Sequence, residues 1–202
     1  MHRRPLIAIG IDPGLTGAVA ALSLDPRTLA VRSAVGVSGY YLNLVSGGLD
    51  INTALRVVDQ CITDVIGANL ERTGAARRSD YEVWGVVEQP GLWDGQRKGA
   101  RQISRVSGDQ RTWRNALQLR CTHLLPDKQA QSIDKRAGLH RSTVGRKGRK
   151  LEVRQFNLLQ VTRGVLPPFL EVPNGCSAPQ DGIHDAVLMA LATLKTASGG
   201  VI

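Results

Sequence analysis

The sequence is poor in aromatic residues and cysteine, and it contains no long hydrophobic run. Aromatic residues make up 4% of the 202 residues, which leaves few side chains for the base stacking that single-strand binding proteins use. The three cysteines are widely spaced and odd in number, so they fit neither a disulfide framework nor a zinc knuckle. No apolar stretch approaches the roughly 20 residues of a membrane span, and Asp12 and Pro13 interrupt the one run that looks like a signal peptide. We therefore expect a cytoplasmic protein with reduced thiols.

Basic residues outnumber acidic ones. The chain has 26 Lys and Arg against 17 Asp and Glu, which gives a formal net charge of +9. Such an excess favours a polyanionic partner, and nucleic acid is the first candidate. Because aromatic residues are scarce, we expect the protein to recognise the backbone and shape of that partner. The length and the 42% hydrophobic content predict one well-buried domain over residues 1–202.

The hydrophobic pattern predicts an α/β fold that begins with an antiparallel three-strand meander, because three apolar strands follow one another through tight turns. The expected strands cover residues 6–11, 16–24, 29–37, 81–87 and 121–125. The expected helices cover residues 50–70, from about 110 to 119, from about 152 to 163, and 180–195. Two segments without clear periodicity, near 91–108 and 135–150, are expected to be basic loop insertions, and the second to be mobile.

Acidic residues recur where predicted elements begin or end. Asp12 ends the first strand, Glu88 follows a later strand, and Asp181 and Asp185 lie at the start of the last helix, four residues apart and so on one helical face. Asp12 before Pro13 is also typical of a turn, and Asp181 of a helix cap; Glu88 has no such alternative. If these elements meet, four carboxylates share one acidic pocket in a basic protein.

Carboxylates crowded in this way repel one another, and a divalent cation relieves the repulsion. Hard oxygen ligands suit Mg²⁺ or Mn²⁺ better than zinc. Two such ions roughly 3.5–4 Å apart activate a water molecule and stabilise the leaving oxygen of a phosphodiester. The sequence therefore predicts a site for two Mg²⁺ ions, with Mn²⁺ as a substitute, held by Asp12, Glu88, Asp181 and Asp185.

Three motifs carry a resemblance to a known family. The segments Gly10-Ile11-Asp12-Pro13-Gly14, Val87-Glu88-Gln89-Pro90 and Asp181-Gly182-Ile183-His184-Asp185-Ala186 resemble, in this order, the RuvC-type Holliday junction resolvases of the RNase H-like superfamily, particularly their phage-borne relatives. The resemblance implies an RNase H-like mixed sheet flanked by helices, a homodimer in a bacterial or phage-in-host setting, and Mg²⁺-dependent paired nicks in opposed strands of a four-way DNA junction. Asp12, Glu88 and Asp185 align with the metal-binding acids of that family.

The fourth metal ligand departs from the family pattern. RuvC proteins commonly place Asp or His three residues before the last Asp, and this position is Gly182 here. We assign the role to Asp181, with His184 as the alternative. A helix turns residue 184 about 100° away from residue 185, so His184 needs irregular backbone, or a supporting role beside the ligands.

Basic residues near the acidic motifs are candidates for phosphate contacts, with solvated surface charge as the alternative. The DNA-binding candidates are Lys98, Arg101, Arg105, Lys128, Arg146, Lys147, Arg149 and Lys150. Lys128 lies in the segment Pro126-Asp127-Lys128, and related phage proteins often carry a basic residue after a proline at this place. Trp93 and Trp113 have two interpretations: wedges in an opened junction, or core packing, which is the commoner fate of tryptophan.

The sequence leaves three other functions open. A less selective nuclease of the same fold would cut flaps, forks or RNA–DNA hybrids. An actin-like ATPase has a similar first strand and glycine-rich turn, but it needs a second domain for which 202 residues leave no room. A DNA-binding scaffold without catalytic activity would not need the acids. The primary prediction is a structure-selective endonuclease that resolves four-way junctions.

Overall fold

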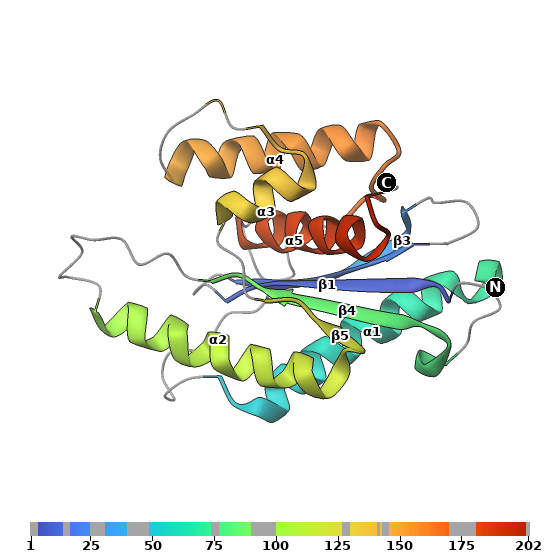
Figure 1. Ribbon diagram of the computed structural model, residues 1–202, viewed down its shortest axis with the longest axis horizontal. Coiled ribbons are helices and arrows are strands. Elements are labelled where there is room, and N and C mark those ends of the chain that lie inside the picture. Colours follow the sequence, from blue (N-terminus) through green and yellow to red (C-terminus); the bar gives the residue numbers. More distant parts are fainter. Residues whose placement is uncertain are drawn as a thin grey trace.

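The computed structural model describes residues 4–13, 17–24, 31–39, 49–73, 77–89, 100–126, 130–140, 142, 146–169 and 181–200. Within these ranges, the side chains of residues 31–39, 71–73, 100–108, 130, 146 and 181 are not described. The described chain has a mixed sheet with helices on both faces (Figure 1). No helix in this part of the chain is long and apolar enough to cross a membrane.

The sheet has five strands in the order β3-β2-β1-β4-β5. Their bounds are β1 Leu6–Asp12, β2 Ala18–Leu24, β3 Val31–Gly39, β4 Glu82–Val87 and β5 His123–Leu124. Strand β2 pairs antiparallel with both β1 and β3, whereas β4 pairs parallel with both β1 and β5. Because β1 and β4 are parallel neighbours, their carboxyl ends meet at the same edge of the sheet.

Strand β1 is buried on both faces, and its side chains alternate between two hydrophobic clusters. Ile7, Ile9 and Ile11 belong to the cluster beneath α1 (Ile51–Thr73) and α2 (Ala100–Arg120). Leu6 and Ala8 belong to the cluster on the opposite face. This alternation follows from the two-residue period of a strand. It assigns even-numbered residues of β1 to the second face.

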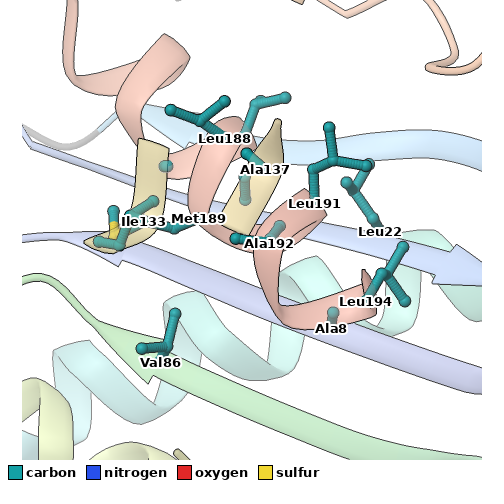
Figure 2. Packing of buried hydrophobic residues seen from close by; sticks show 14 of the residues in the cluster. Ala8, Leu22, Val86, Ile133, Ala137, Leu188, Met189, Leu191, Ala192 and Leu194 are labelled. Atoms are coloured by element: carbon teal, nitrogen blue, oxygen red, sulfur yellow. The ribbon is translucent and has the colours of Figure 1, made fainter. Parts of the chain in front are cut away.

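Three helices cover this second face: α3 (Ala130–Ala137), α4 (Arg146–Thr162) and α5 (Asp181–Ala197) (Figure 1). Helix α5 lies directly on the sheet and also packs against α3 and α4. Figure 2 shows this cluster, to which α5 contributes Leu188, Met189 and Leu191 and the sheet contributes Ala8 and Val86. The apolar sequence of α5 therefore reflects its place between the sheet and two outer helices.

Most of the predicted elements are confirmed, but two helices begin earlier than predicted and one was missed. Helix α2 begins at Ala100, not near Gln110, and α4 begins at Arg146, not near Glu152. The short α3 had no predicted counterpart. Consequently, the segments predicted as basic loops are partly helical: residues 100–108 belong to α2, and residues 135–137 and 146–150 belong to α3 and α4.

Candidate active site

Asp12 and Glu88 lie next to each other at the carboxyl ends of β1 and β4. The parallel register pairs Ile11 with Val87, and the backbone N–H of Glu88 donates a hydrogen bond of 3.0 Å to the carbonyl oxygen of Ile11. Continuing the register by one residue puts Asp12 beside Glu88. Ala8 and Val86 belong to the cluster beneath α5, so the same alternation assigns Asp12 and Glu88 to the face that α5 covers.

Gly10 allows α5 to approach this end of β1 closely. A Cβ atom on Gly10 would lie 2.5 Å from the backbone nitrogen of Ala190 and 2.7 Å from Cβ of Met189, and it would also collide with the carbonyl oxygen of Ala186. A side chain of any kind is therefore excluded unless the helix moves. The contact brings Asp185, which precedes Ala186, to the edge where β1 and β4 end.

The electrostatics of Glu88 indicate that the three acids converge. Burial of its carboxylate is the main cause that holds the pKa of Glu88 well above its usual range, and the negative charges of Asp12 and Asp185 raise it further. The positive charge of Arg149 opposes this effect only in part. Asp12, Glu88 and Asp185 thus interact electrostatically at this end of the sheet, while their assignment as metal ligands stays a prediction.

Asp185 is 5% exposed and belongs to a buried ion network that the sequence did not predict. Nη1 of Arg149 on α4 donates to Oδ1 of Asp185 at 2.8 Å. The same guanidinium donates from Nε and Nη2 to both carboxylate oxygens of Asp134 on α3, at 3.0 and 2.9 Å. Burial raises the pKa of Asp185, while Arg149 and Lys150 counteract part of that shift.

Asp134 is the site residue that sequence reasoning missed. It is 1% exposed and contributes to the raised pKa of Glu88. The available signal was Ile133 and Ala137, two buried residues four positions apart that mark the inner side of a short helix. Asp134, beside Ile133, is buried with them.

The fourth ligand position stays a prediction. Asp181 is the first residue of α5, and its side chain lies outside the described residues. A regular helix places residues 181 and 185 on one face. The alternative, His184, is 1% exposed; its ring packs edge-on against Phe169 with centroids 5.5 Å apart, and its carbonyl oxygen accepts a hydrogen bond of 2.8 Å from Asn157.

The chemistry of the converging acids fits a hard divalent cation. Carboxylate oxygens are the ligands that Mg²⁺ and Mn²⁺ prefer, and mutual repulsion among Glu88, Asp12 and Asp185 is what a bound cation relieves. Among the described side chains, no group of three His, Cys, Asp or Glu residues forms a ready-made metal cluster. The donor set is therefore of the right type, while the described side chains alone do not complete a cage.

The predicted DNA-binding residues fall into three groups. Lys147 is exposed on α4, and Lys150 is half-buried and close enough to Asp185 to lower its pKa. Arg149 is 9% exposed and bound to two carboxylates, so it is not the loop residue that the sequence suggested. The remaining candidates have side chains, or the whole residue, outside the described part of the chain: Lys98, Arg101, Arg105, Lys128 and Arg146.

The two tryptophans have different outcomes. Trp113 is fully buried in the cluster between the sheet, α1 and α2. The interpretation of Trp113 as a junction wedge is therefore wrong, and the core-packing alternative is confirmed. Trp93 lies outside the described residues.

Replacing Glu88 by Gln is expected to stabilise the protein at neutral pH when divalent cations are chelated. The folded-state pKa of Glu88 lies above its unfolded value. At a pH between these two pKa values unfolding releases a proton, so the free energy of unfolding falls as pH rises through that window. The E88Q variant has no carboxylate to titrate at this position, and it therefore does not lose stability in this way. We expect Tm to rise by a few °C at pH 7.5, at roughly 2–4 °C per kcal/mol.

Thermal unfolding in EDTA, followed by circular dichroism from pH 4 to pH 8, measures this effect. The difference between E88Q and wild type should shrink as pH falls toward the ordinary Glu value of ~4.3. The control is D64N, which alters an exposed carboxylate on α1 and should leave the pH profile unchanged. An E88Q protein less stable than wild type at pH 7.5 would contradict the electrostatic assignment.

Comparisons with known proteins give a likeness to solved structures but not to sequence families. No protein-family model matches the sequence, and no curated protein matches it. Among solved structures, the chain is similar to the crystal structure of the yeast mitochondrial Holliday junction resolvase Ydc2, with a TM-score of 0.45 and 13% sequence identity. That alignment covers 95% of this chain and 79% of the yeast chain.

Proposed function

We propose that this protein is a metal-dependent endonuclease that resolves four-way DNA junctions by paired nicks. The observation that carries the proposal is the meeting of Asp12, Glu88 and Asp185 at one sheet edge, with the pKa of Glu88 raised by burial and by the other two acids. The charges of these three acids act on one another inside a protein of net charge +9. This combination suits hydrolysis of a polyanion by bound cations.

The residues of the site have distinct tasks in this mechanism. Asp12 and Glu88 hold the cations from the two parallel strands, and Asp185, with Asp181 as the proposed fourth ligand, holds them from α5. Mg²⁺, when bound, supplies an activated water and neutralises charge on the phosphodiester. Lys147 and Lys150 on α4 are proposed to contact the DNA phosphates beside the site. The reaction leaves a 5′-phosphate and a 3′-hydroxyl.

The proposal includes a homodimer in which each subunit carries one active site. Symmetric incision of a junction requires two sites related by a two-fold axis, and an isologous dimer supplies them. The sequence motifs that resemble the RuvC-type resolvases support this assembly. Sizing the protein with and without a labelled junction tests it, because one dimer per junction is expected.

A cleavage assay on matched substrates tests the proposed specificity. Four-way, Y-shaped and RNA–DNA hybrid substrates of the same arm sequences are compared in Mg²⁺ at one salt concentration, since electrostatic binding alone would favour none of them strongly. Two symmetric nicks in the four-way junction, with little cutting of the others, support a resolvase. Equal cutting of all three would identify a less selective nuclease, and no cutting in Mg²⁺ or Mn²⁺ would overturn the proposal.

A further inference from the structure

Arg149 connects three helices through the carboxylates on either side of it. It lies on α4, Asp134 on α3 and Asp185 on α5, and the side chains of all three are at most 11% exposed. One guanidinium therefore serves two buried carboxylates. The network thus has more acidic than basic groups, and all three of its members act on the charge of Glu88.

The two halves of this network are unequal. Asp134 accepts two hydrogen bonds, from Nε and Nη2, which is the bidentate geometry that holds a guanidinium firmly. From the same guanidinium, Asp185 accepts one hydrogen bond, from Nη1 at Oδ1. Loss of the contact with Asp185 would leave both hydrogen bonds between Arg149 and Asp134 in place. Arg149 would therefore stay bound to α3 when Asp185 binds another cation.

We propose that Arg149 is a positioning residue that competes with the divalent cation for Asp185, and that Asp134 anchors Arg149 so that this competition stays weak. The inference rests on the proposed metal-dependent function. A cation bound by Asp185 would share that carboxylate with the guanidinium that already contacts Oδ1, and it would be repelled by this guanidinium. Asp134 draws that guanidinium toward α3. Arg149 and Asp134 together thereby set the cation concentration at which the site fills, and they also keep the Asp185 carboxylate in place.

A purely structural role is the alternative, because buried ion pairs often link elements with little net gain in stability. Such a role predicts changes in stability alone. Competition predicts changes in the affinity for a metal ion, with a sign that depends on which member of the pair is altered. The metal affinity of the protein without DNA therefore separates the two.

The experiment is calorimetric measurement of Mn²⁺ binding to the purified full chain, without DNA. R149Q removes the competing charge and is expected to bind Mn²⁺ about tenfold more tightly than wild type. D134N removes the anchor, leaves Arg149 on Asp185, and should bind more weakly than wild type. R56Q removes an equal charge from an exposed position on α1, across the sheet, and should leave the affinity unchanged.

The double variant R149Q/D134N guards against misfolding, because R149Q alone leaves the buried Asp134 without its cation. The double variant lacks both charges and should bind Mn²⁺ more tightly than D134N, since the two differ only in the competing guanidinium. Equal or weaker binding in both comparisons, R149Q with wild type and the double variant with D134N, would overturn the inference. If Mn²⁺ binds wild type but not D12N in that case, the proposed function stands and only the inference about Arg149 is wrong. If Mn²⁺ does not bind wild type, both the inference and the proposed function are wrong.

Discussion

Replacing Asp12 by Asn is expected to abolish cleavage of a four-way DNA junction in Mg²⁺ while the protein still binds the junction. Asp12 ends β1 beside Glu88, where its charge contributes to the raised pKa of Glu88. The amide keeps the size of the side chain but removes the charge that a hard cation requires. Metal-assisted charge stabilisation is worth several kcal/mol, so the rate should fall at least about 10³-fold at 1.36 kcal/mol per factor of ten.

Two measurements distinguish lost chemistry from lost structure in D12N. Junction binding by gel shift in EDTA should match wild type, because the basic residues proposed to contact phosphate are unchanged. D64N, which removes a carboxylate from the exposed surface of α1, should cut at the wild-type rate. A D12N protein that cuts in Mg²⁺ within tenfold of wild type would remove Asp12 from the catalytic assignment.

The position of each of the three acids in its own element could be predicted because it depends on local patterns. An apolar strand that ends in Asp12, a second that ends before Glu88, and a helix that carries Asp185 near its start are each visible in the sequence. What had to be assumed was that the two strands are neighbours. The parallel pairing of β1 with β4 supplies that step, and the two-residue alternation then assigns both acids to the side of α5.

The network of Arg149 and Asp134 could not be predicted in the same way. The residues of α4 that face inward include Arg149, Val153 and Asn157, spaced by four, and two of the three are polar. A hydrophobic pattern is therefore missing from the first turns of α4, which is why the segment looked like a basic loop. The burial of Arg149 depends on Asp134 and Asp185, which come from two other helices, and this is a tertiary property.

Replacing Gly10 by Ala is expected to destabilise the protein and to reduce cleavage, although Gly10 is not a ligand. The new methyl group would overlap backbone atoms of α5 at Ala186 and Ala190, which cannot move out of the way as a flexible side chain can. Overpacking of this kind costs roughly 1–3 kcal/mol, so Tm should fall by about 5 °C at 2–4 °C per kcal/mol. A shift of α5 also moves Asp185 away from Asp12, and a displacement near 1 Å lowers rates about 10²-fold.

Gly67 provides the matched control because it is exposed within α1 and a Cβ there would meet nothing within 4 Å. Alanine has the higher helix propensity, by roughly 0.8–1 kcal/mol, so G67A should raise Tm and leave cleavage unchanged. The same substitution thus has opposite effects on stability at the two positions. Thermal unfolding and cleavage rates measured on both variants test this contrast; a G10A protein with wild-type Tm and activity would mean that close contact between β1 and α5 does not position Asp185.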